Sequence, residues 1–239
     1  MTRNCCGDGL DVAENLRKIR ERIREACAAC GRDESEVTLM AVTKTVPPER
    51  VNKALDAGVR LLGENRVQEC CEKYQSYHCT AEQIHLIGHL QTNKIRSIID
   101  KVSMIESVDS LHLAKELDEA LKKRDMEMDI LLQVNIGMES RKSGFAPEEL
   151  LEAYKEISDS CSQLRLRGLM AIPPKEEGDR YFGKMEEFYQ KLRDVSAPGK
   201  APEILSMGMS GDYPIAVEEG STMVRVGSAV FGARDYNNK

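Results

Sequence analysis

Several sequence features that would place a protein in a particular class are missing from this chain. It has no tryptophan, and aromatic residues make up only 5% of its 239 positions. No apolar run approaches the roughly 20 residues that a membrane-spanning helix needs. The first nine residues lack the apolar stretch of a signal peptide. We therefore expect a cytoplasmic protein that contacts no membrane.

An excess of positive charge is also missing. Lysine and arginine number 34 against 40 aspartates and glutamates, which gives a net charge of −6 at pH 7. A nucleic-acid partner favours a basic face, because its phosphate backbone is uniformly negative. The sequence therefore predicts no nucleic-acid partner. With 41% hydrophobic and 31% charged residues, the composition is that of an ordinary globular protein.

Eight cysteines are present, but their spacing is not typical of a disulfide framework or a zinc site. Cys27 and Cys30 form one C-x-x-C step, and no second step or histidine pair completes a site around it. His85 and His89 lie four residues apart, again without a third ligand. We predict reduced thiols and no bound metal.

The segment Thr38–Lys44 organises the rest of the chain. Its apolar, partly β-branched run predicts a buried strand, and Lys44 stands at the C-terminal end of that run. In α/β proteins, ligands bind beyond the C-terminal ends of parallel strands. A lysine there has a partly desolvated amine, and the neutral amine can form a Schiff base with a carbonyl. The alternative is a surface lysine that ends the strand with its charge in water.

Strand and helix patterns alternate along the chain. An amphipathic helix is predicted over residues 10–30, and a later one is expected to begin at Pro147. Apolar runs predict eight strands, at Thr38–Lys44, Val59–Leu62, Ile84–Ile87, Val102–Ile105, Met128–Val134, Leu166–Ala171, Ile204–Leu205 and Thr222–Val226. Short strands that alternate with helices indicate a parallel sheet.

Eight units favour a barrel over an open sheet. The units take roughly 24 residues each, which suits a compact (β/α)8 fold. The alternative, a doubly wound open sheet, usually has fewer strands and a glycine-rich first turn, and no G-x-G-x-x-G follows the first strand. We predict an α/β protein with a single (β/α)8 TIM barrel domain over residues 10–239, an extra N-terminal helix, and a flexible extension at residues 1–9.

Two segments rich in small residues lie where barrels often bind phosphate, after the seventh and eighth strands. Ser206–Gly211 carries two serines and two glycines, and Arg225, Gly227 and Ser228 stand at the end of the eighth strand. Small residues let backbone N–H groups approach an anion. The pattern predicts a phosphate cup. The alternative is a pair of glycine turns with a strand arginine in a surface ion pair.

One small molecule would satisfy both predicted sites. Pyridoxal 5′-phosphate (PLP) carries an electrophilic carbonyl that could react with Lys44 and a phosphate that could bind on the other side of the barrel. Six ordered motifs strengthen this interpretation: Ala41–Lys44, Gly63–Asn65, Ile87–Lys94, Gly168–Ile172, Ser206–Ser210 and Met223–Gly227. By these motifs the chain from Val37 to Tyr236 resembles the PLP homeostasis protein family (YggS/PROSC, pyridoxal phosphate-binding protein).

The resemblance implies the barrel of the alanine racemase N-terminal domain and a Schiff base between PLP and Lys44. It also implies ring contacts by Asn65 and Met207, and phosphate contacts by Ser210, Arg225, Gly227 and Ser228. Arg225 has an alternative place against the pyridine nitrogen, where it would weaken the cofactor as an electron sink. Ser228 stands where the family pattern has threonine, and it keeps the hydroxyl.

The function that the resemblance implies is PLP homeostasis by a monomeric carrier that holds and delivers the cofactor, with PLP-dependent apo-enzymes as transient partners. We predict no catalytic residue. The chain ends at Lys239 soon after the eighth unit, and no tyrosine or cysteine is placed as the second acid or base of a racemase. Two alternatives stay open: a PLP-dependent amino-acid racemase or decarboxylase that uses Lys44 as base, and a cofactor-free scaffold that binds a protein.

Overall fold

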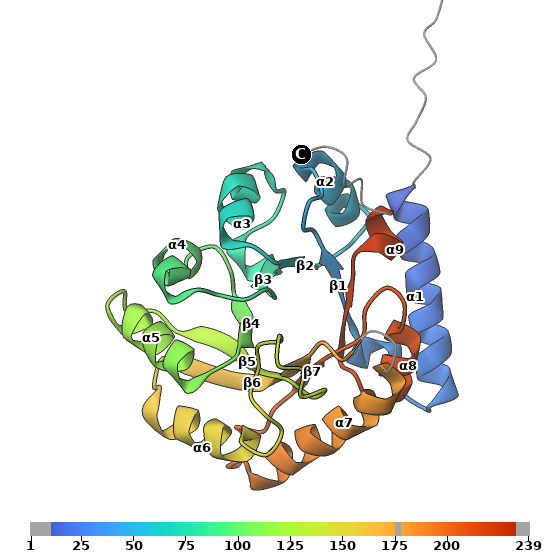
Figure 1. Ribbon diagram of the computed structural model, residues 1–239. Helices are drawn as coiled ribbons and strands as arrows, with labels where there is room; N and C mark the ends of the chain where they lie inside the picture. Colours follow the sequence, from blue (N-terminus) through green and yellow to red (C-terminus); the bar gives the residue numbers. More distant parts are fainter. Residues whose placement is uncertain (1–10, 175–177, 233–239) are drawn as a thin grey trace, which may run out of the picture.

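The computed structural model describes residues 11–174 and 178–232 (Figure 1). Within them, eight parallel strands close into a barrel in sequence order, with β8 paired to β1. The strands are β1 (Thr38–Val42), β2 (Leu61–Glu64), β3 (Ile84–Leu86), β4 (Met104–Val108), β5 (Met128–Val134), β6 (Leu164–Ala171), β7 (Ile204–Ser206) and β8 (Met223–Val226). The predicted (β/α)8 barrel is confirmed, whereas the extension at residues 1–9 lies outside the described residues.

Helices follow the strands and surround the barrel (Figure 1). They are α2 (Pro48–Asp56), α3 (Val67–Lys73), α4 (Ile95–Ile98), α5 (Leu111–Lys122), α6 (Leu150–Ser160), α7 (Gly178–Val195), α8 (Tyr213–Glu218) and α9 (Ser228–Phe231). In the part of the chain that the structure covers, no helix combines the length and apolarity needed to cross a membrane.

The predicted extra helix is α1 (Val12–Ala29), which precedes the barrel. It begins after Asp11, whose carboxylate accepts the backbone N–H groups of Ala13 and Glu14 as an N-cap. Its apolar stripe, which includes Leu16 and Ile19, is buried. The helix packs beside α8 and α9, so it lies against the segments that follow the last two strands (Figure 1).

Two strands, β2 and β4, begin and end later than the sequence predicts. Val59 and Val102 are buried but lie in the loops before β2 and β4, so their apolar character wrongly indicated strand. Both strands then continue past the predicted ends, through Glu64 and Glu106, which are fully buried. A buried carboxyl inside a strand needs partners from other segments, which the local pattern does not show.

The start of α6 was predicted at Pro147 and is found at Leu150. The three residues from Pro147 form a turn instead, in which the N–H of Glu149 donates to the carbonyl of Ala146 at 3.0 Å.

Side chains inside the barrel are mostly apolar: Met40, Val42, Leu61, Ile87, Met104, Leu131, Met170, Ile204 and Met223. On β4, β7 and β8 these apolar residues, Met104, Ile204 and Met223, are the first of each strand. Two residues farther along β4, β7 and β8 come Glu106, Ser206 and Arg225, all buried. The C-terminal end of the barrel therefore carries the polar interior, as expected for a ligand site.

The cysteines carry no disulfide in the described chain. Six of them are free there, and Cys27, Cys70 and Cys161 are buried. Burial raises the pKa of the Cys70 thiol to about 12, so this group stays protonated and unreactive near neutral pH.

Candidate functional site

Predicted site residues from four neighbouring strands meet at one side of the barrel mouth. Lys44 follows β1, Asn65 directly follows β2, Ser210 follows β7, and Gly227 directly follows β8. The strands β7, β8, β1 and β2 are consecutive in the closed barrel, and all are parallel. The structure therefore brings the lysine and the small-residue loops to adjacent strand ends.

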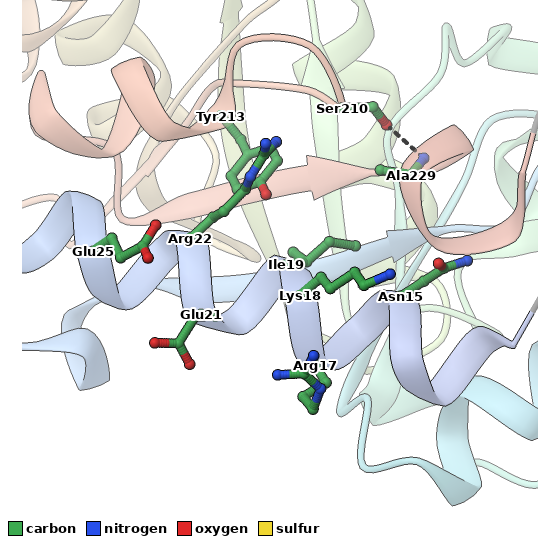
Figure 2. A pocket seen from close by; sticks show the side chains of 10 residues that line it. All are labelled: Asn15, Arg17, Lys18, Ile19, Glu21, Arg22, Glu25, Ser210, Tyr213 and Ala229. Atoms are coloured by element: carbon green, nitrogen blue, oxygen red, sulfur yellow. Dashed lines mark hydrogen bonds between the residues drawn. The ribbon is translucent and has the colours of Figure 1, made fainter.

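The loops after β7 and β8 are joined through Ser210. Its Oγ accepts the backbone N–H of Gly227 at 3.2 Å and that of Ala229 at 3.3 Å. Figure 2 shows the second of these bonds, at the edge of a groove of about 540 Å³ between these loops and α1. The two N–H groups therefore converge on one oxygen, and an anion bound here would accept them in place of Ser210 Oγ.

Gly208 makes the first of these two loops possible. Its φ is +89°, which favours glycine, and a Cβ at this position would lie 2.5 Å from the Cβ of Ala216 on α8. The loop can therefore pack against α8 only because this position has no side chain.

Lys44 is half-buried and lies in a strained turn. The next residue, Thr45, has φ +63°, a conformation that costs a β-branched residue about 1–3 kcal/mol. The N–H of Thr45 donates to the Glu69 carboxylate at 2.5 Å. On the other side of Lys44, the carbonyl of Thr43 accepts a hydrogen bond from the Lys73 ammonium at 3.3 Å. Glu69 and Lys73 also pair with each other, so α3 supports both flanks of the lysine.

A buried carboxyl lies beneath the same turn. Oε1 of Glu64 accepts hydrogen bonds from the hydroxyls of Thr43 (2.7 Å) and Tyr77 (2.5 Å), and Oε2 has no partner within the described residues. Burial raises the pKa of Glu64, and the hydrogen bonds from Tyr77 and Thr43 oppose that rise. The pKa of the Tyr77 phenol is also raised, by burial and by the carboxyl beside it.

Asn65 presents a second unsatisfied acceptor. Its Oδ1 is buried and has no hydrogen-bond partner in the described part of the chain. The loop after β3 presses against this residue, since a Cβ on Gly88 would lie 2.0 Å from the Asn65 carbonyl oxygen. A buried acceptor without a donor is costly, which indicates that a ligand or solvent group supplies the donor.

Arg225 lies inside the barrel and not on the loop held by Ser210. Its guanidinium is 3% exposed and donates to Ser206 Oγ and to the carbonyl of Ala171, both at 2.7 Å. Burial lowers the pKa of the guanidinium, and the charge of Glu106 opposes that effect. These contacts do not support the expected phosphate role. A place below the mouth agrees better with the alternative, contact with a ring.

The side chain of Met207 does not line the mouth. Residues alternate along β7 and beyond its end, so Ser206 faces the interior while Met207 is fully buried in the apolar cluster between strands and helices. The predicted contact of this side chain with a ring is therefore not supported. Ser228 is exposed at the start of α9, next to the backbone groups that Ser210 accepts.

A chain of buried polar groups inside the barrel was not predicted from the sequence. Oε1 of Glu106 lies 2.7 Å from Nδ1 of His85, and its Oε2 accepts the hydroxyl hydrogen of Ser206 at 2.6 Å. That hydroxyl in turn accepts from Arg225. The signal was present, because Glu106 directly follows the apolar pair Met104 and Ile105. No group of three or more His, Cys, Asp or Glu residues suited to a metal occurs among residues 11–174 and 178–232.

Comparison with known proteins places this chain in a family. The model of the alanine racemase N-terminal domain matches residues 14–235. The pyridoxal phosphate homeostasis protein of Aquifex aeolicus is 38% identical, over 95% of this chain and all of that protein. The protein of the same name from Pseudomonas aeruginosa is 42% identical, over 94% of this chain and 96% of that one.

A solved structure extends the likeness to three dimensions. PipY of Synechococcus elongatus PCC7942, with PLP bound, has a TM-score of 0.77 and 33% identity, over 93% of this chain and all of that one. The chain therefore belongs to the alanine racemase N-terminal domain family and, within it, to the pyridoxal phosphate homeostasis proteins.

Proposed function

We propose that this protein binds PLP and acts as a carrier and regulator of the cofactor in the cell. One observation carries the proposal: a lysine and an anion-receiving pair of loops lie at adjacent strand ends of one barrel mouth. The relatives named pyridoxal phosphate homeostasis protein and the PLP-bound PipY structure support it.

The residues present fit PLP. The cofactor supplies an aldehyde and, when bound, an electron-withdrawing ring. Lys44 offers the amine for a Schiff base with that aldehyde. The hydroxyl of Ser210 and the N–H groups of Gly227 and Ala229 suit the phosphate, with Ser228 beside them. Asn65 brings a buried acceptor that needs a donor.

Arg225 has a different role in this proposal from the one expected at first. Its guanidinium lies in the barrel, held by Ser206 and the Ala171 carbonyl, and it suits the pyridine nitrogen better than the phosphate. An arginine there keeps that nitrogen unprotonated, which weakens the ring as an electron sink.

Arg225→Gln distinguishes the two places for this residue. Contact with the ring predicts a shifted absorption band with inorganic phosphate still bound as in the parent. Contact with the phosphate predicts weaker binding of inorganic phosphate by about 1.5–3 kcal/mol, the usual worth of a charge-assisted hydrogen bond. Absorption spectra and phosphate titrations of the two proteins measure both quantities.

A PLP-dependent racemase or decarboxylase is the second candidate function, and one pair of residues favours it. Nδ1 of His89, in the loop after β3, lies 2.9 Å from Asp109 after β4. The imidazole is mostly exposed and the carboxylate is largely buried. A histidine oriented by a carboxylate at a barrel mouth is a suitable general acid or base.

Mixing the PLP-loaded protein with each common amino acid separates the two functions. A carrier leaves every amino acid unchanged and transfers PLP to an added PLP-dependent apo-enzyme, whose activity then appears. Racemisation or decarboxylation of any amino acid, lost again in Lys44→Ala, would contradict the carrier proposal. Residues 10–239 are proposed to act in this as one monomeric cofactor-binding unit, which light scattering on the loaded protein tests.

A further inference from the structure

The helix α3 holds the backbone on both sides of Lys44 with one pair of side chains. Glu69 accepts the N–H of Thr45, and Lys73 donates to the carbonyl of Thr43. The spacing of four residues puts the two side chains on one face of α3, where they also pair with each other. Each is about 15–16% exposed, so solvent weakens the pair less than it weakens a surface ion pair.

The backbone at this turn needs such support. Threonine is β-branched and disfavours the φ of +63° found at Thr45. Without the acceptor on Glu69, this N–H loses its charged partner and the turn loses the contact that opposes the strain. The residue that would then move is Lys44, because it lies between the two supported peptide groups.

We propose that Glu69 and Lys73 are positioning residues for Lys44 and that they set how long PLP stays on its amine. The proposal rests on the proposed function, since it assumes that Lys44 holds the cofactor. In this proposal α3 controls the release of PLP, and the loops after β7 and β8 bind the phosphate. A carrier needs such a division, because it must hold its cargo and still let it leave.

Two probes separate positioning of Lys44 from damage to the whole pocket. PLP reports on the lysine, whereas pyridoxine 5′-phosphate lacks the aldehyde and reports only on the phosphate and ring contacts. In Glu69→Gln and Lys73→Met, the visible band of the loaded protein should decay roughly tenfold faster after dilution, as expected for a lost charge-assisted hydrogen bond. The affinity for pyridoxine 5′-phosphate should stay that of the parent, and Lys73→Arg should restore slow decay.

A matched control lies on the neighbouring, solvent-exposed face of the same helix. Gln68 and Glu72 have the same spacing and an exposed hydrogen bond of 3.0 Å. Glu72→Gln should therefore leave the decay rate unchanged. The proposal is overturned if Glu69→Gln and Lys73→Met release PLP at the parent rate, if Glu72→Gln accelerates release equally, or if pyridoxine 5′-phosphate is lost in parallel.

Borohydride labelling of the parent protein tests the proposed function separately from the positioning role. If borohydride does not attach PLP to Lys44 in the parent, the proposed function itself fails. If Lys44 is labelled in the parent and both variants behave like it, only the positioning role fails.

Discussion

Different kinds of groups stabilise the two sides of the barrel mouth, the turn at Lys44 and the loops after β7 and β8. Around Lys44, charged and titratable side chains support the turn: Glu64 from β2 accepts the Thr43 hydroxyl, and Glu69 and Lys73 from α3 bind backbone groups. Around the anion-receiving loops, backbone N–H groups, the Ser210 hydroxyl and the glycine conformation of Gly208 determine the geometry.

The difference indicates which perturbations act on which side. Substitutions that change charge, and changes of pH, should affect the lysine side because its supports carry protons and charges. The loop side holds its shape mostly through backbone groups and the Ser210 hydroxyl, which do not titrate, although the Asp212 carboxylate also accepts the N–H of Met209 at 2.6 Å. Substitutions that change side-chain volume or the allowed range of φ should affect the loop side instead. Variants on each side can therefore test this difference.

Replacing the lysine gives the largest expected effect. Lys44→Ala removes the amine, so the visible band of the PLP complex should disappear entirely. The loops after β7 and β8 are untouched, and pyridoxine 5′-phosphate should still bind with parent affinity. Absorption spectra and equilibrium dialysis measure the two quantities. A variant that kept the band would show that another group holds the aldehyde.

The next effect is on the loop side and on stability. Gly208→Ala places a methyl group against Ala216 at a positive φ, which should destabilise the fold by about 2–4 kcal/mol. Urea unfolding measures this loss. Gly211→Ala is the matched control, because a Cβ there meets no atom within 4 Å. Equal stability of the two variants would mean that the loop adapts and that Gly208 does not determine its shape.

A smaller effect is expected from the hydroxyl that joins the loops. Ser210→Ala should weaken pyridoxine 5′-phosphate binding by about 1 kcal/mol, or roughly fivefold in Kd. The expected dependence on pH is that of the parent, because no titratable group is removed. Ser162→Ala, in the exposed turn after α6, serves as the control. Parent affinity in Ser210→Ala would remove this hydroxyl from the phosphate site.

The smallest effect is a pH dependence on the lysine side. Burial raises the pKa of Glu64 above its usual value of 4.5, so its contribution to stability is complete below that value and is lost as pH rises through the folded-state pKa. Glu64→Gln keeps an oxygen acceptor for Thr43 and Tyr77 and carries no charge. The Tm of the parent should therefore fall relative to that of Glu64→Gln as pH increases from 4.5. Parallel Tm curves of the two proteins over this range would contradict this.

Much of the architecture follows from the sequence alone. The bounds of β5 were predicted from its apolar run, and the barrel followed from the count of strand patterns. Lys44, Asn65, Ser210 and Gly227 then come together because parallel strands end at the same rim.

The rest depends on contacts between distant segments. Glu106 is accommodated in a strand because Ser206, 100 residues away, donates a hydrogen bond to it. The positive φ of Thr45 is supported by Glu69, 24 residues farther along the chain. The inward or outward direction of Met207 and Arg225 depends on strand register, which composition does not reveal.

The central claim is that Lys44 holds PLP, and chemical trapping tests it most directly. The full chain is loaded with PLP, reduced with borohydride and digested, and the modified peptide is identified by mass spectrometry. We expect loss of the visible band and a single pyridoxyl label on Lys44. No visible band, or a label spread over the surface lysines, would contradict the account and leave the barrel a binding scaffold of another kind.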